Sequence, residues 1–98
     1  MVKIWVDDVR KKPDNYDIWL KSVTDTTHYL RSFKPSDNFL IDIDHDAGDF
    51  SILGGDYYKI LDWCEKHHLN PTVHIHSMNP VGIQKMRLII QRNNWKEI

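Results

Sequence analysis

The stretch Phe39–Gly48, which reads Phe-Leu-Ile-Asp-Ile-Asp-His-Asp-Ala-Gly, decides the fold. An apolar run enters it, three carboxylates and a histidine are set into and after that run, and a glycine ends it. This order is typical of a buried β-strand that ends in a polar site. The stretch therefore predicts a central strand over Phe39–Asp44 with functional side chains directly after it.

Two other apolar runs end in polar residues in the same way. Val2–Val6 is followed by Asp7 and Asp8, and the run Thr72–His76 is followed by Ser77. In an open sheet of parallel strands, ligands bind in the crevice outside the carboxyl ends of the strands. The three runs together predict a parallel sheet with a site at that edge.

The segments between these runs predict three helices and one further strand. Thr24 is the expected N-cap of a helix that ends near Phe33, and Asp56 is the expected cap of the second helix. Pro80 suits the first turn of the last helix, because its missing N–H is not needed there. The run Asp17–Val23 is expected to be a strand parallel to the others, although its preceding loop is short for a parallel crossover.

This order of elements predicts one compact α/β sandwich over residues 1–98, with a mostly parallel sheet of about four strands and three helices. The hydrophobic content of 41% and the charged content of 28% are ordinary for a globular domain. The net charge of -1 gives no global basic field, so we expect no long duplex nucleic acid as a partner.

The single cysteine, Cys64, falls within an apolar helical pattern, which favours a buried structural thiol and a reducing cytoplasm. The first residues read as a strand, so no signal peptide is expected. No apolar run approaches the roughly 18 residues of a membrane span, so no membrane partner is expected. We therefore expect a cytoplasmic location.

The carboxylates at the predicted edge favour a hard divalent cation. Asp7, Asp8 and Asp44 are the expected ligands of Mg²⁺ or Mn²⁺, because such ions prefer oxygen donors. Participation of His45 or His76 would shift the preference toward Mn²⁺ or Zn²⁺. No organic cofactor is expected.

Histidines at the same edge offer a second route to phosphate chemistry. His45 and His76 each come at the end of a predicted strand. An imidazole ionises near neutral pH, so one histidine can activate water while the other protonates a leaving oxygen. Asp44 or Asp46 would orient an imidazole. The residues alone leave the metal route and the two-histidine route open.

Other polar groups near this edge are expected to hold the phosphate oxygens. They include the N–H groups at the start of the last helix, which form a natural anion site. The side chains and the backbone position expected to contribute are Arg10, Ser77, Asn79 and Gly82. His74 lies on the same strand face as His76, and it either joins this set or is a hydrogen-bonded core histidine.

Three motifs resemble the cyclic-phosphate-processing receiver-like domain family. They are Val6-Asp7-Asp8-Val9-Arg10, then Asp44-His45-Asp46-x-Gly48, then His74-x-His76-Ser77-x-Asn79-Pro80-Val81-Gly82. The resemblance covers essentially the whole chain, and its last motif is the most specific. It implies a reduced receiver-like, flavodoxin-like fold. It also implies a phosphodiesterase-type hydrolase that acts on 2′,3′-cyclic phosphates of RNA ends or on cyclic nucleotides.

A more distant resemblance links the chain to response-regulator receivers. There, an acidic pair like Asp7 and Asp8 binds a metal, an acid in the place of Asp44 accepts a phosphoryl group, and a hydroxyl residue stands in the place of Ser77. This chain departs from that pattern because it lacks the first helix and the fifth strand with its lysine. These departures make a phosphoacceptor role the least favoured reading.

A non-catalytic module that sequesters a cyclic or phosphorylated nucleotide is the alternative to an enzyme. Tyr57, Tyr58 and Trp63 lie near the glycine-rich loop, where they either stack on a base or belong to the core. A binding module would return its ligand intact, whereas an enzyme would turn it over. The tail Asn93–Trp95 is either a homodimer contact or a segment that folds back on the core.

Overall fold

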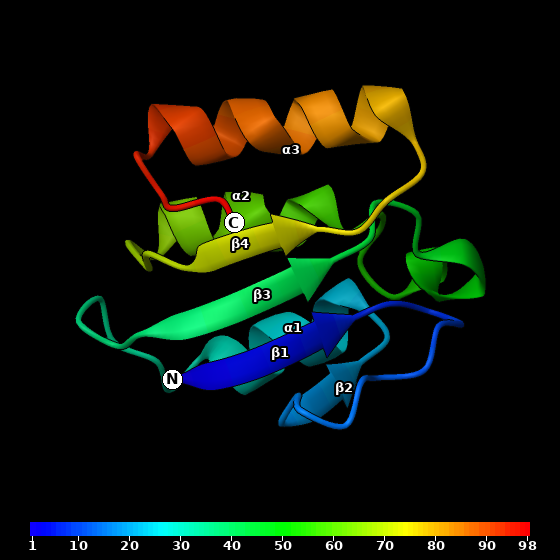
Figure 1. Cartoon of the computed structure of the whole chain (residues 1–98), viewed down its shortest axis with the longest axis horizontal. Coiled ribbons are helices and arrows are strands. Elements are labelled where there is room, and N and C mark those ends of the chain that lie inside the picture. Colours follow the sequence, from blue (N-terminus) through cyan, green and yellow to red (C-terminus); the bar gives the residue numbers. More distant parts are fainter.

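A computed structural model of the chain describes residues 1–98 and contains one sheet of four parallel strands. The strands lie in the order β2-β1-β3-β4, and three helices accompany them (Figure 1). The predicted α/β class and parallel sheet are confirmed. The elements are β1 (Val2–Val6), β2 (Ile18–Leu20), α1 (Val23–Leu30), β3 (Phe39–Ile43), the 3-10 turn η1 (Gly48–Ile52), α2 (Tyr58–Lys66), β4 (Thr72–Ile75) and α3 (Pro80–Arg92).

The core lies between the sheet and the helices. Alternate strand residues point to one face, and Ile4, Ile41 and Val73 all lie there with no exposed surface. Helical side chains such as Leu61 and Met86 complete the same cluster. Burial of these apolar groups is the main stabilising term of the fold, and it fixes the direction in which the intervening strand residues point.

The opposite face of the sheet carries no helix. Figure 1 shows α1 and α2 behind the strands, with α3 beyond β4, where it packs against α2. Trp5, Asp42 and His74 alternate with core residues and share one register row across three strands. The loop after β1 lies against part of this face: Trp5 Nε1 donates to the carbonyl of Arg10, and the Tyr16 ring meets the Trp5 ring edge-on.

The short second strand is parallel to β1, as predicted, but it ends earlier than expected. The predicted range Asp17–Val23 is wrong at both ends, since β2 covers only Ile18–Leu20. Ser22 starts α1 because its Oγ accepts the N–H of Asp25 at 3.0 Å. The predicted cap, Thr24, therefore lies inside the first turn of α1, and the helix ends at Leu30 rather than near Phe33.

The starts of the other two helices differ in how they are capped. Pro80 occupies the first turn of α3, as predicted, and Asn79 caps that helix by accepting the N–H of Gly82 at 3.1 Å. Asp56 does not cap α2, so that prediction is wrong. Its carboxylate instead accepts the N–H of Ala47 at 3.1 Å, which ties the start of α2 to the loop after β3.

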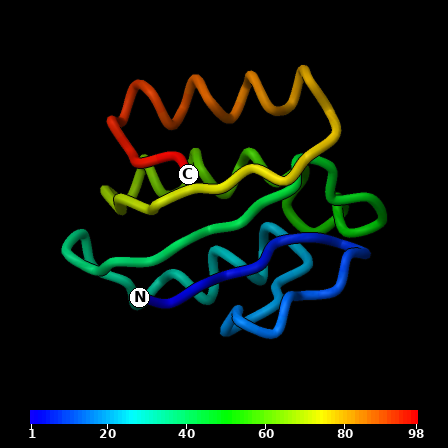
Figure 2. Tube along the Cα trace, in the orientation of Figure 1, coloured from blue at the N-terminus to red at the C-terminus, as the bar shows by residue number.

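The end of the chain folds back on the core. Trp95 is buried, and Glu97 pairs with Val73 of β4 in parallel fashion. Figure 2 shows the last residues returning to β4 from the end of α3. Of the two alternatives for this tail, the structure supports folding back. None of the helices is long and apolar enough to cross a bilayer.

Candidate functional site at the carboxyl edge of the sheet

The sheet ladder continues one step beyond the strands and sets the polar residues in register. The N–H of Asp44 donates to the carbonyl of Val6 at 3.1 Å, and the N–H of His76 donates to the carbonyl of Ile43 at 3.0 Å. On the β2 side of β1, the N–H of Asp7 donates to the carbonyl of Leu20 at 3.4 Å. The three strand ends are therefore held at one edge by backbone hydrogen bonds.

Three carboxylates meet at this edge. Asp7, Asp8 and Asp44 each offer one oxygen, and the three oxygens lie within 4.8 Å of one another. No lysine or arginine pairs with Asp8 or Asp44, and Arg10 only approaches Asp7, at 3.9 Å. Burial and the neighbouring charges of Asp7 and Asp44 raise the pKa of Asp8. This concentration of negative charge is a fit for a hard divalent cation.

Backbone geometry adapts the chain to this cluster. Gly48 has a φ of +55°, and a Cβ there would lie 2.3 Å from Oδ2 of Asp8. Asp7 has no exposed surface, and its Oδ1 accepts the N–H groups of Val9 and Arg10 at 2.9 and 2.8 Å. Burial would raise the pKa of Asp7, but these backbone bonds and His76 outweigh it and lower the pKa. Asp7 is therefore a fixed, ionised carboxylate.

His76 is held between two carboxylates. Its Nδ1 lies 2.6 Å from Asp42 and its Nε2 lies 2.9 Å from Asp7. The ring stacks flat on Trp5 at a centroid distance of 4.0 Å. Burial alone would lower the pKa of His76, but Asp42 and Asp7 together raise it. Ionised carboxylates only accept hydrogen bonds, so between ionised Asp42 and Asp7 both ring nitrogens donate and the ring is an imidazolium.

Asp42 is a nearly fully buried carboxylate inside β3, and it pairs with His76, which is partly buried. It also accepts the Tyr16 hydroxyl, so that Tyr16, Asp42, His76 and Asp7 form one chain of hydrogen bonds. Burial and the Asp42 carboxylate raise the pKa of Tyr16, which keeps it a donor. The chain runs from the helix-free face to the carboxylates at the edge.

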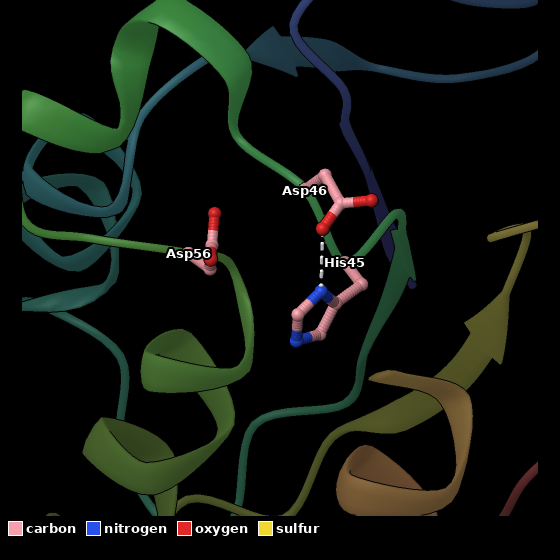
Figure 3. Close-up of side chains that lie close together, drawn as sticks. All are labelled: His45, Asp46 and Asp56. Atoms are coloured by element: carbon pink, nitrogen blue, oxygen red, sulfur yellow. Dashed lines mark hydrogen bonds and ion pairs between the residues drawn. The ribbon is translucent and has the colours of Figure 1, made fainter. Parts of the chain in front are cut away.

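His45 lies in a different setting. Its Nδ1 lies 2.8 Å from Oδ1 of Asp46, and the amide of Asn79 donates to the same oxygen at 3.3 Å. Its Nε2 has no protein partner, and 12% of the side chain is exposed. Asp56 faces the pair from the segment that precedes α2 (Figure 3). His45 is therefore oriented through one nitrogen and free at the other.

The start of α3 and the start of α2 fix the His45 ring. A Cβ at Gly82 would lie 2.3 Å from Cγ of His45, so only glycine allows this approach. Tyr58 stacks against the ring at a centroid distance of 5.9 Å and 13° between planes. Lys85 lies over the Tyr58 ring at 3.7 Å from its centroid. Tyr58 therefore contacts both the His45 ring and the Lys85 side chain.

The other residues expected to hold phosphate are partly engaged within the protein. Arg10 Nη1 donates to the carbonyl of His76 at 2.7 Å, and Ser77 Oγ accepts the N–H of Asn79 at 3.1 Å. The side-chain oxygen of Asn79 accepts the N–H of Gly82, so one N–H of the first turn of α3 is already used. Their roles toward a phosphate stay predictions. His74 lies within β4 rather than at the edge, and its Nδ1 lies 2.9 Å from the carbonyl of Ile98.

The aromatic residues near the glycine-rich loop are occupied by protein contacts. Tyr57 is fully buried, and its hydroxyl donates to the carbonyl of Lys21 at 2.8 Å. The Tyr58 ring contacts both Lys85 and His45, and the Trp63 ring stacks on His67 at a centroid distance of 4.0 Å. Trp63 lines two of the three hollows on the molecular surface. None of the three is lined by the edge carboxylates, His45 or His76, so the site is an open edge rather than a cleft.

Sequence reasoning missed several participants in these clusters. The sequence pattern assigns neither Trp5 nor Tyr16 to the site, and it predicts Asp56 as a helix cap. A charged residue in the middle of an apolar strand was the available signal for Asp42, because a buried carboxylate needs a partner. No comparable signal distinguishes Asp56 from an N-cap.

Comparison with known proteins adds one finding. A family model described as "Cyclic-phosphate processing Receiver domain" matches residues 2–92. No curated protein and no solved structure matches the chain.

Proposed function

The chain belongs to the cyclic-phosphate processing receiver family, and we propose that it is a phosphoesterase that hydrolyses cyclic phosphates at the carboxyl edge of its sheet. The proposed substrates are 2′,3′-cyclic phosphates of RNA ends or cyclic nucleotides. One observation carries the proposal: the carboxylates Asp7, Asp8 and Asp44 meet beside His45, whose outer ring nitrogen is free. An anion clamp alone would not need that concentration of negative charge.

The donor set of the carboxylate cluster fits Mg²⁺ or Mn²⁺. Asp7, Asp8 and Asp44 would hold such an ion, and all three offer oxygen, the donor that hard cations prefer. Once bound, the ion supplies positive charge to the phosphate oxygens and favours attack by water. The absence of a Cβ at Gly48 keeps Asp8 free to take part.

His45 is the proposed proton-transfer residue. Ring opening requires water to add to phosphorus and one ester P–O bond to break, and the departing oxygen must gain a proton. His45 gives that proton to the departing oxygen from its free Nε2. The proton that the attacking water loses then returns Nε2 to its protonated state. Asp46 accepts the hydrogen bond from Nδ1 and so fixes the orientation of the imidazole.

His76 takes a different part in the proposed reaction. Both of its nitrogens donate to carboxylates, so it has no lone pair with which to accept a proton from water. It instead anchors Asp7 by a charge-assisted hydrogen bond of 2.9 Å. The two histidines predicted to act as an acid–base pair thus divide into a proton carrier, His45, and a positioning residue, His76.

The phosphate is held from two directions in this proposal. Arg10 is half exposed, and its guanidinium has donors left after its bond to the His76 carbonyl. On the other side, the first turn of α3 offers its dipole, and the Asn79 amide lies 3.5 Å from His45. Ser77 and Gly82 shape this turn through their bonds to the Asn79 backbone and side chain.

The test is incubation with 2′,3′-cyclic nucleotides and with an oligonucleotide that ends in a 2′,3′-cyclic phosphate, followed by ³¹P NMR. We expect ring opening to a phosphomonoester over many turnovers in Mg²⁺ or Mn²⁺, with loss of turnover in EDTA. His28→Gln, on the exposed face of α1, serves as the matched control for His45→Gln. Recovery of all ligand intact, with a shifted bound resonance, would instead establish a binding module.

A further inference from the structure

We infer that the groove between α1 and α2 binds the single-stranded RNA that leads to the cyclic phosphate. Trp63 provides the stacking surface, and Lys59 and Arg31 provide the phosphate contacts. The identification of the ligand as RNA rests on the proposed function, whereas the shape, the charge and the aromatic lining of the groove do not. The groove contains none of the edge carboxylates and neither His45 nor His76.

Two adjoining hollows make up the groove, where α1 and α2 pack against each other. One, with a volume of about 640 Å³, lies between the start of α1 and Lys59, and the other, of about 540 Å³, lies between the end of α1 and His67. Arg31 and Trp63 line both hollows, so the two are continuous along the helices. Each volume falls in the range of about 300–1,000 Å³ that is usual for ligand sites, and together they suit an extended ligand.

The groove is positively charged. Three of the four arginines of the chain have hydrogen-bond partners within it, and Arg31 is the one that does not. Lys59 is exposed and forms no ion pair. Asp25 is the only acid that lines either hollow, and its place in the first turn of α1 suits the helix dipole. Two permanent positive charges against one negative charge favour an anionic ligand.

Backbone geometry holds the Lys59 side chain at the groove. Gly55 has a φ of +97°, and a Cβ there would lie 3.0 Å from Cδ and 2.9 Å from Nζ of Lys59. The absence of that Cβ lets the lysine lie along the loop before α2. A side chain that is already restricted loses less conformational entropy when it meets a phosphate.

Trp63 adds an aromatic surface and an unused donor. Its ring is partly buried and stacks on the exposed His67 at a centroid distance of 4.0 Å. Trp5 and Trp19 donate their indole N–H groups to carbonyls at 2.8 and 2.7 Å, whereas the N–H of Trp63 has no acceptor in the chain and is open to solvent. Aromatic rings on which bases stack, set beside cations that meet the phosphates, are the usual means of binding single-stranded nucleic acid.

The groove begins beside the proposed active edge. Tyr58, at the start of α2, stacks against His45, and Lys59, the next residue, lines the groove. Gly54, at the far end of the loop that carries His45, lines it too. A helix with its side chains is about 10–12 Å across, so an RNA chain of a few nucleotides reaches from the edge, over the first turn of α2, into the groove.

The experiment measures binding of a fluorescently labelled RNA hexanucleotide of uridines with a 3′-hydroxyl end, by fluorescence anisotropy in EDTA, so that neither turnover nor a metal ion contributes. We expect the hexanucleotide to bind at least tenfold more tightly than uridine monophosphate. Trp63→Leu should lose about tenfold in affinity, within the range for one stacked base, and Trp63→Phe should keep most of it. Urea unfolding checks that both variants are folded.

The exposed cations test the groove without disturbing the core. Lys59→Gln and Arg31→Gln should each weaken binding and lower the slope of log affinity against log salt by about 0.7, the value for one phosphate contact on a single strand. Asp25→Asn should strengthen binding, because it removes the acid from the groove. Lys96→Gln, an exposed lysine of the C-terminal tail, is the matched control and should bind as wild type does.

Equal affinity in Lys59→Gln, Arg31→Gln and Lys96→Gln would overturn the inference, and so would competition by hexaglutamate as strong as that by unlabelled RNA, which would indicate an acidic peptide as the ligand. In the ³¹P assay, wild type should show a lower KM for the oligonucleotide than for the cyclic mononucleotide. Lys59→Gln should narrow that difference, and Lys96→Gln should preserve it. A protein that binds the hexanucleotide through these residues but hydrolyses no cyclic phosphate would retain the RNA groove and disprove only the proposed function.

Discussion

His76 and His45 come at the ends of neighbouring parallel strands and each has an acid beside it, yet their surroundings differ. His76 lies between Asp42 and Asp7, stacked on Trp5, with no nitrogen left over. His45 has one carboxylate partner and a free Nε2. The comparison shows that an imidazole between two carboxylates is held as a charged imidazolium. An imidazole with one carboxylate partner is oriented by it and keeps one nitrogen free for proton transfer.

The largest expected effect comes from removing the His45 imidazole. His45→Gln should lower kcat for 2′,3′-cyclic nucleotide hydrolysis by about a thousandfold, within the range of general acid–base catalysis. Its free energy of unfolding should fall by only about 1 kcal/mol, because the change removes the hydrogen bond between the ring and Asp46 and part of the packing against Tyr58. Urea unfolding and the ³¹P assay on the same samples check both statements, and full activity in the variant would contradict the role of His45.

Removing the His76 imidazolium should mainly lower the free energy of unfolding. His76→Gln leaves Asp7 and Asp42, both buried, without their shared cation, and should cost about 3 kcal/mol, as for other broken buried pairs. This is a large part of the roughly 5–15 kcal/mol that stabilises a small domain. Chemical unfolding measures the loss. A loss no greater than that of His28→Gln would show that His76 is not an imidazolium bridge.

Gly82→Ala tests the packing of His45 without touching its ring. The added Cβ would lie 2.3 Å from Cγ of His45, so the ring must move. A displacement of about 1 Å can cost a hundredfold in rate, and we expect a loss of this order in kcat with Mg²⁺ binding at the carboxylate cluster retained. Val81→Ala, one position away and exposed, is the matched control. Equal kcat in Gly82→Ala and wild type would show that the ring tolerates the shift.

The smallest expected effect is a pH dependence of stability. Burial lowers the pKa of His76, but Asp42 and Asp7 outweigh it and raise the pKa above its unfolded value of about 6.5. The stabilisation is therefore complete below about pH 6.5 and is lost as pH rises through the folded pKa. The lowered pKa of Asp7 adds stability that is lost only as pH falls below about 4.

Urea unfolding of wild type and His76→Gln at pH 6 and pH 9 checks this sign. The gap between the two proteins should be wider at pH 6 than at pH 9. A gap that widens toward pH 9 would mean that His76 is buried neutral.

Much of the architecture could be predicted from local pattern. Apolar runs that end in acids and histidines indicated parallel strands and their functional edge, and the motifs around Asp7, Asp44 and His76 indicated the family. The start of α1 was misplaced because Ser22 and Thr24 are both good caps, and only the folded backbone shows which hydroxyl meets the N–H of Asp25.

The contents of the site were harder to predict because they depend on long-range register. Trp5, Asp42 and His74 share a row only once three strands are aligned, and Tyr16 reaches Asp42 across a loop. The separation of His45 from His76 into different clusters has the same origin. Sequence spacing gives both histidines the same description, and tertiary contacts give them different partners.

The most direct test of this division is ¹⁵N NMR of the imidazole rings near neutral pH, with EDTA present and with or without 2′,3′-cyclic nucleotide. We expect both ring nitrogens of His76 to carry protons, and Nε2 of His45 to respond when the nucleotide is added while the His76 signals stay in place. An unprotonated nitrogen on His76 that responds to the nucleotide, with His45 unaffected, would contradict the account.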